Sequence, residues 1–95
     1  MYYVYILADN LNKTIYTGIT NDLVRRVYEH KHNLDQDSFT ARYNVHKLVF
    51  FETTPSVYSA IEREKQIKSW SRKRKNDLVN TQNPDWQELY DSLLE

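Results

Sequence analysis

Three stretches of the chain carry the hydrophobic pattern of β-strands. Residues 2–8 are apolar at both alternating sets of positions, which is typical of a strand covered on both faces. A polar turn at residues 9–13 separates this stretch from residues 14–19, so the two stretches predict a β-hairpin. Residues 46–54 contain a run of apolar and β-branched side chains and predict a third strand.

The first predicted helix follows the hairpin. It covers residues 22–34, and Thr20 or Asn21 is its candidate N-cap. Its narrow apolar stripe consists of Leu23, Val27 and Leu34. Residues 35–45 are polar and predict a loop.

Three further helices are predicted in the second half of the chain. Pro55-Ser56 begins a helix that runs to about residue 70. Ser71 is expected to cap a short basic helix through Val79. Asn83-Pro84 combines a cap with a first-turn proline and predicts a last helix over residues 85–94. Its expected packing face comprises Trp86, Leu89, Tyr90 and Leu93.

The size and composition narrow the class of protein. A chain of 95 residues is expected to form one domain over residues 1–95, with a modest core. The chain has no cysteine, which excludes disulfides and cysteine-ligated zinc. No signal peptide and no membrane-spanning apolar run is recognisable, so we expect a soluble cytoplasmic protein.

The net charge is zero, but the charges are unevenly distributed. The segment from Arg63 to Lys75 carries one acidic residue, Glu64, among seven basic ones: Arg63, Lys65, Lys68, Arg72, Lys73, Arg74 and Lys75. From Asp77 onward the chain has acidic residues and no basic one. A neutral total therefore conceals a basic stripe, which is a candidate nucleic-acid-binding surface, and an acidic tail.

Several polar side chains are expected to converge near the only glycine, Gly18. In a hairpin, Tyr5 on one strand and Tyr16 on the other would stand side by side next to it, because alternate residues share a face. Arg26 and His30 are four residues apart on the helix that follows, so they project together.

Glu64 is the strongest anomaly in the pattern, since it lies among the apolar positions of its helix. A carboxylate in an apolar stripe is costly unless it is paired, protonated or bound to a metal. Lys68 is four residues further along and offers a simple ion pair. Metal binding and ion pairing both remain open on this evidence.

In this order and spacing, Tyr3-Val4-Tyr5, Tyr16-Thr17-Gly18, Arg26-x-x-x-His30 and Glu64 resemble the GIY-YIG nuclease superfamily, and in particular its small stand-alone bacterial branch. Tyr3 stands where the family has its first glycine, and Thr17 where it has an isoleucine. The resemblance implies an α+β fold in which a three-stranded antiparallel sheet, made of the hairpin and a third strand, is flanked by helices. It also implies metal-dependent hydrolysis of DNA phosphodiester bonds, of the kind used in repair and recombination.

The resemblance also implies residue roles. Glu64 would bind one Mg²⁺ or Mn²⁺ ion, and Arg26 would hold the scissile phosphate. Tyr5 and Tyr16 would flank the attacking water, one of them as general base, and His30 would orient or deprotonate a tyrosine. A late asparagine would support the site, and Asn83 is preferred to Asn80 for this position. Gly18 and the basic stripe would contact the DNA, whether branched or single-stranded, and a protein partner is a possible targeting device.

Two other functions compete with a nuclease. The chain can be a nucleic-acid-binding module that uses the same cleft and the basic stripe from Arg63 to Lys75 but cuts poorly or not at all. It can also be a protein-interaction domain that uses its acidic C-terminal helix. The only residues that suggest this function are Trp86 and Tyr90. Each candidate residue also has a purely structural explanation, and it is their joint occurrence that favours the nuclease.

Overall fold

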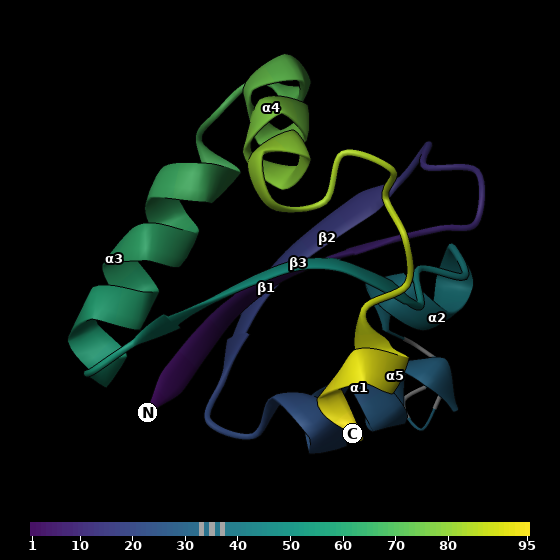
Figure 1. Ribbon diagram of the computed structural model, residues 1–95, viewed down its shortest axis with the longest axis horizontal. Coiled ribbons are helices and arrows are strands. Elements are labelled where there is room, and N and C mark those ends of the chain that lie inside the picture. The colour runs from purple at the N-terminus through teal and green to yellow at the C-terminus, as the bar shows by residue number, and fades with distance from the viewer. Residues whose placement is uncertain (33, 35, 37) are drawn as a thin grey trace.

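In the computed structural model, which describes residues 1–32, 34, 36 and 38–95, three antiparallel strands form a sheet in the order β2-β1-β3 (Figure 1). The strands are β1 (Tyr2–Ala8), β2 (Ile15–Thr20) and β3 (Lys47–Thr54). Each lies within one residue of its predicted position. The helices are α1 (Leu23–Lys31), α2 (Phe39–Arg42), α3 (Val57–Lys68), α4 (Arg72–Gln82) and α5 (Tyr90–Leu93). The predicted α+β fold is confirmed.

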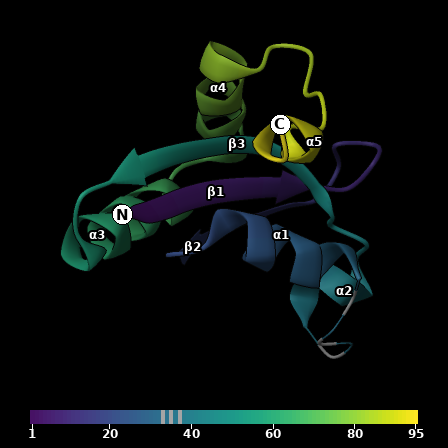
Figure 2. The ribbon, with the colours of Figure 1, turned by 60° about the horizontal axis from the view of Figure 1, so that its bottom comes forward.

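The central strand β1 is covered on both faces, which explains why both of its alternating sets of side chains are apolar. Its even-numbered side chains from Val4 to Ala8 pack against α3 and α4 in one core. On the other face, Tyr5 and Leu7 pack against α1 and α5 in a second core. Figure 2 shows α1 and α4 on opposite sides of the sheet. Because side chains alternate along a strand, Tyr5 and Leu7 necessarily share the face that carries α1.

Helix α1 begins and ends differently from the prediction. Asp22 is its N-cap and accepts a hydrogen bond from the backbone N–H of Arg25 (3.2 Å). Thr20, one of the predicted caps, instead bonds to the backbone of Asp22 in the preceding turn. The helix ends at Lys31, and Leu34 is 65% exposed, so it does not extend the apolar stripe.

The segment predicted as a loop contains helix α2. Ser38 is its N-cap, and its hydroxyl accepts a hydrogen bond from the backbone N–H of Ala41 (3.3 Å). The helix has only four residues and buries only Thr40, so it leaves almost no periodic hydrophobic signal. Positions 35 and 37 of the predicted loop lie outside the described residues.

The predicted C-terminal helix over residues 85–94 is wrong in its first half. Asn83 is the C-cap of α4, and the backbone at Trp86 has a positive φ of 52°, which interrupts any helix there. The segment instead covers the outer edge of β3, where Leu48 donates its N–H to the Glu88 carboxylate (2.7 Å) and accepts a bond from the N–H of Leu89 (2.8 Å). An uncovered strand edge leaves unpaired backbone groups, so these bonds outweigh the local helical pattern.

The other two predicted helices are present with shifted ends. Ser56 rather than Pro55 marks the start of α3, since its side chain caps the helix. Ser71 caps α4 as predicted, and that helix extends beyond Val79 to Gln82. No helix in the described part of the chain has both the length and the apolar character needed to cross a bilayer.

Candidate active site

The β-hairpin places two tyrosines and a glycine together. Tyr5 lies directly opposite Gly18 in the β1–β2 register, and the rings of Tyr5 and Tyr16 are 6.3 Å apart between centroids. A Cβ atom added to Gly18 would lie 2.6 Å from the Tyr5 hydroxyl and 2.9 Å from a ring carbon of Tyr16. The φ angle of Gly18 is not positive, so the strand needs a glycine here for space rather than for backbone conformation.

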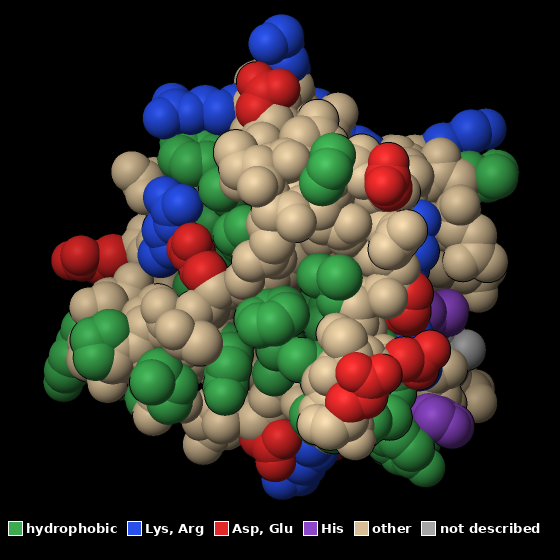
Figure 3. All heavy atoms as spheres, viewed as in Figure 1, with side chains coloured by type: hydrophobic (Ala, Val, Ile, Leu, Met, Phe, Trp, Pro, Cys, Tyr) green, Lys and Arg blue, Asp and Glu red, His purple; other side chains and the backbone are tan. Residues whose placement is uncertain are grey.

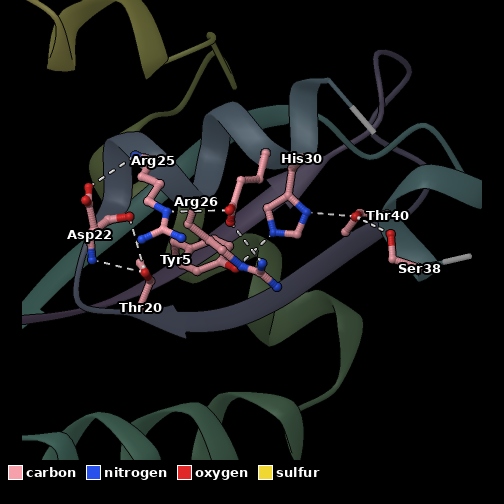
Figure 4. Close-up of polar contacts among 9 residues, drawn as sticks. Tyr5, Thr20, Asp22, Arg25, Arg26, His30, Ser38 and Thr40 are labelled. Carbon is pink, nitrogen blue, oxygen red and sulfur yellow. Dashed lines mark hydrogen bonds and ion pairs between the residues drawn. The ribbon is translucent and has the colours of Figure 1, made fainter. Parts of the chain in front are cut away.

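Helix α1 brings His30 to the Tyr5 hydroxyl. A hydrogen bond of 3.1 Å joins the hydroxyl to Nε2 of His30, and a second one of 2.8 Å joins Nδ1 of His30 to the hydroxyl of Thr40 (Figure 4). The Thr40 hydroxyl lies 3.2 Å from that of Ser38. Tyr5, His30 and Thr40 are all buried. The site thus contains a hydrogen-bonded chain that connects β1 through α1 to α2.

Burial sets the protonation states of Tyr5 and His30 in this hydrogen-bonded chain of side chains. Burial, together with the neighbouring Arg26, lowers the pKa of His30 to about 4. Burial, followed by the neighbouring Tyr16, raises the pKa of Tyr5 to about 12, although Arg26 opposes this shift. At pH 7 both groups are therefore neutral, and the imidazole of His30 has one unprotonated nitrogen that can accept a hydrogen bond.

Arg26 projects from α1 on the same side as His30, because the two residues are one helical turn apart. Its guanidinium bonds to the carboxylate of Glu29 (3.2 Å) and lies beside the Tyr5 hydroxyl (Figure 4). Its side chain remains 44% exposed. An exposed guanidinium next to two phenols is suited to bind a phosphate through bidentate hydrogen bonds.

Glu64 comes from α3, which packs against β1 and β2. Its side chain is only 19% exposed and forms an ion pair with Lys68 (3.5 Å). After burial and Tyr16, the charge of Glu64 is a further contributor to the raised pKa of Tyr5. The structure therefore contains the ion pair that the spacing suggested, and the Glu64 carboxylate acts electrostatically on one of the two phenols.

The donor set narrows the kind of metal that the site can hold. Within the described residues, no group of three or more His, Asp or Glu side chains is arranged to hold an ion. A lone carboxylate does not suit Zn²⁺, which takes three or four protein ligands. It does suit Mg²⁺, which keeps several waters and uses one or two carboxylates together with substrate phosphates. Glu64 fits that pattern.

The basic stripe does not act as one surface. Figure 3 shows Lys and Arg side chains along α4 and the end of α3. Arg72 donates to the backbone carbonyls of Asn12 and Lys13, while Arg74 lies over the ring of Trp70 at 4.1 Å. Two other members are paired with carboxylates, Arg63 with Glu52 and Lys73 with Asp77. Lys65 is exposed.

Two lysines of the stripe reach the site. Lys68 and Lys75 line a surface groove whose other lining residues are Ile15, Tyr16, Thr17 and Phe39. Their ammonium groups therefore lie on the same groove as one of the two candidate catalytic phenols. Of the remaining basic residues, Arg63 attaches α3 to β3 and Arg72 attaches α4 to the β1–β2 turn.

Neither candidate asparagine lies in the cluster. Asn83 is buried at the edge of β3, where its side-chain N–H₂ donates to the carbonyls of Val49 (3.0 Å) and Gln87 (2.8 Å). Its side-chain oxygen accepts from the N–H of Gln87 (3.0 Å). Asn80 accepts a bond from the indole of Trp86 (2.7 Å). In this structure Asn83 supports the site only through the position of β3.

The sequence analysis missed three participants. Thr40 and Ser38 complete the hydrogen-bonded chain from α2, and Glu29 holds the guanidinium of Arg26. Glu29 lies one turn from its partner and could have been found from that spacing. Thr40 and Ser38 lie in a polar stretch where no pattern indicated a contact with His30.

The fold and this cluster of two tyrosines, an arginine, a histidine and a glutamate define a small α+β domain of the nuclease type. The chain belongs to the GIY-YIG family, since the family model described as "GIY-YIG catalytic domain" matches residues 1–77. Membership in this family of nucleases indicates DNA as the class of substrate.

The matches to similar proteins cover nearly the whole chain. A UPF0213 protein of Syntrophus aciditrophicus is 39% identical over 83 residues, which cover 87% of this chain and 93% of the relative. A UPF0213 protein of Desulfotalea psychrophila is 34% identical over 91 residues, covering 94% of this chain and 80% of the relative. The solution NMR structure of a UPF0213 protein from Bacillus halodurans is similar with a TM-score of 0.58 and 30% identity, and the match covers 93% of each chain.

Proposed function

We propose that this protein is a divalent-metal-dependent endonuclease that hydrolyses phosphodiester bonds in DNA. We further propose that it has low sequence specificity or recognises DNA structure, and that it acts in repair or recombination. The observation that carries the proposal is the convergence of Arg26, Tyr5 and His30 from two elements, next to Tyr16 and over the space left by Gly18. A solvated helix face would not connect these groups through buried hydrogen bonds.

Arg26 is the phosphate-binding group in this proposal. Its guanidinium has five donors in a rigid fork and stays charged at any pH at which the protein is folded. The carboxylate of Glu29 holds it in the structure, and a phosphate, which carries more acceptor oxygens, would replace that partner. The ammonium groups of Lys68 and Lys75 would neutralise further phosphates along the groove.

The two tyrosines differ in access and in connection. Tyr16 lines the groove and is positioned to orient the attacking water. Tyr5 is fully buried, but its hydroxyl is connected to a neutral histidine. We assign the proton relay to Tyr5 and His30: the phenol takes the proton of the water and passes its own to Nε2 of His30. Because Arg26 lies beside the Tyr5 hydroxyl, its movement toward a bound phosphate would give the water access.

Glu64 is the residue that would hold a divalent cation, most simply Mg²⁺. A bound ion would polarise the phosphate and stabilise the leaving oxygen. Without the metal, the ion pair with Lys68 provides the part-buried carboxylate with a partner of opposite charge.

The test is cleavage of labelled DNA with Mg²⁺ or Mn²⁺ at low salt. Single-stranded, duplex, flapped and branched DNA would be compared for the wild type and for Glu64→Ala. Loss of the metal-holding carboxylate should abolish cleavage, while the far-UV circular dichroism stays unchanged. Glu62→Ala is the matched control, because Glu62 is an exposed carboxylate on the same helix and should be dispensable. A Glu64→Ala protein that cuts as fast as the wild type would refute the proposal.

A second candidate function is a binding module that cuts poorly or not at all. One observation favours it: both charged groups of the site are paired within the protein, Arg26 with Glu29 and Glu64 with Lys68. The same experiment separates the two functions. Salt-sensitive binding without cleavage of any of the four DNAs would favour the binding module.

A further inference from the structure

A row of aromatic rings leads from the candidate active site to the protein surface. The ring of Tyr16 lies 5.7 Å from that of His30 and 6.2 Å from that of Phe39, with which it is stacked. The ring of Phe39 lies 4.8 Å from that of Tyr43. The proposed chemistry uses Tyr16 and His30 but gives no role to Phe39 or Tyr43.

Phe39 and Tyr43 are exposed although they are large and partly or wholly apolar. Phe39 is 44% exposed and Tyr43 is 51% exposed. Burying these two rings would stabilise the fold by about 25 cal/mol for each Å² of apolar surface, and a domain with a modest core loses this stabilisation when they stay in solvent. Adjacent exposed apolar side chains mark binding surfaces more often than single ones do.

The same contacts that complete the site hold the two rings in place. Helix α2, which carries them, is capped by Ser38 and is joined to His30 through the Thr40 hydroxyl. The rings are therefore held in a defined position next to Tyr16.

The charged residues of the groove indicate the kind of ligand. Phe39 and Tyr16 line the groove together with the side chains of Lys68 from α3 and Lys75 from α4. Aromatic faces and ammonium groups in one groove match a nucleotide, whose base stacks while its phosphate is neutralised. A paired base has both faces covered within the duplex, so only an unpaired base can stack on these rings.

We propose that Phe39 and Tyr43 form a stacking platform for unpaired bases of the DNA strand, beside the phosphate that Arg26 binds. The substrate would then be single-stranded, or unpaired next to the bond that is cut. This inference rests on the proposed function, because it takes the cluster around Tyr5 as the place where the phosphate lies.

Binding measured without divalent metal tests the platform separately from catalysis. The probes are fluorescein-labelled dT12 and a hairpin whose strands are joined by a hexaethylene glycol linker, so that it holds no unpaired base; binding is followed by anisotropy in EDTA. Base–aromatic stacking predicts that Phe39→Ala binds dT12 roughly 5- to 140-fold more weakly, with hairpin binding changed less than about twofold. Phe39→Trp should keep the affinity, since it retains an aromatic face.

The control is Tyr58→Ala, which removes an aromatic side chain that is 78% exposed on the first turn of α3. Its affinity for both probes should equal that of the wild type. Tyr43→Ala is the second test, because Tyr43 is the C-cap of α2 and makes no side-chain hydrogen bond among the described residues. It should also weaken dT12 binding selectively.

Abasic probes identify the mechanism. An abasic site placed in turn at each position of dT12 should weaken wild-type binding at one or two positions and have no further effect on Phe39→Ala. Equal affinity of wild type, Phe39→Ala and Tyr43→Ala for dT12 would overturn the inference, as would a loss of equal size for dT12 and the hairpin.

Cleavage data keep this inference distinct from the proposed function. Selective binding of dT12 that depends on Phe39, in a protein that cuts no DNA, would retain the platform and refute the nuclease. Cleavage of single-stranded and duplex DNA at the same rate by wild type and Phe39→Ala would retain the nuclease and refute the platform.

Discussion

Gly18→Ala is the substitution whose effect the structure predicts most directly. The new Cβ atom would lie 2.6 Å from the hydroxyl and 2.7 Å from Cζ of Tyr5, where an ordinary contact begins at 3.4 Å. One of the partners must therefore move by about 0.8 Å. Tyr5 has no exposed surface and is hydrogen-bonded to His30, so it has little room to give way.

The expected loss of stability combines two opposing effects. Overpacking of a well-packed site costs about 1–3 kcal/mol. Replacing glycine by alanine in a strand lowers the entropy of the unfolded chain and returns roughly 0.5–1 kcal/mol. Because the contact is far shorter than 3.0 Å and the Tyr5 ring has no exposed surface, the cost of overpacking should lie in the upper part of its range, at about 2–3 kcal/mol. The free energy of unfolding should then fall by about 1–2.5 kcal/mol, which for a domain of this size lowers the melting temperature by about 4–20 °C.

Urea and thermal unfolding followed by circular dichroism measure this change. The matched control is the same substitution in a Tyr5→Ala background, where only the 2.9 Å contact with Cε2 of the part-buried Tyr16 remains and the loss from Gly18→Ala should be clearly smaller. A Gly18→Ala protein as stable as the wild type would refute the reasoning. So would an equal loss in both backgrounds, because the cost would then not come from Tyr5.

Two further predictions concern the buried polar groups. The pKa of His30 is lowered from 6.5 to about 4 in the folded protein, so between these two pH values the unfolded chain binds a proton that the folded protein does not. The free energy of unfolding should therefore fall by up to about 3 kcal/mol as the pH is lowered from 6.5 to 4. Urea unfolding across this range should show the slope, and His30→Gln should lack it. Asn83→Ala should lower the free energy of unfolding by about 2–3 kcal/mol, since it leaves the buried carbonyl of Val49 and two part-buried backbone groups of Gln87 without their partner. Asn80→Ala should cost less than about 1 kcal/mol, and equal losses at both positions would contradict the structural role of Asn83.

The basic stripe illustrates how a surface inferred from composition changes in three dimensions. Its residues lie on two helices and point in several directions, so Lys68 and Lys75 meet at the groove while Arg72 is used to fasten α4 to the β1–β2 turn. The third function considered from the sequence is an interaction surface on the C-terminal helix, and of that helix only the short α5 (Tyr90–Leu93) is present. Trp86 and Tyr90 are partly buried against the two cores.

The sequence by itself determined the three strands, the first helix and the shared face of Arg26 with His30. These features depend on local periodicity, which is two residues for a strand and 3.6 for a helix, and on backbone geometry that any chain obeys. The convergence of the two tyrosines on the glycine also followed, because a hairpin with a short turn leaves few possible registers.

Only the tertiary structure decided the rest. Helix α2 exists because Ser38 caps it and Thr40 bonds to His30, and neither contact has a sequence period. The segment after Asn83 does not form the whole helix that its pattern predicts. It bonds instead to backbone groups at the edge of β3, which would otherwise be unpaired. The position of Glu64, whose charge acts on the Tyr5 phenol, depends on the packing of α3 on the sheet. Contacts between residues far apart in the chain depend on how elements pack, and that information is not contained in the pattern of any one element.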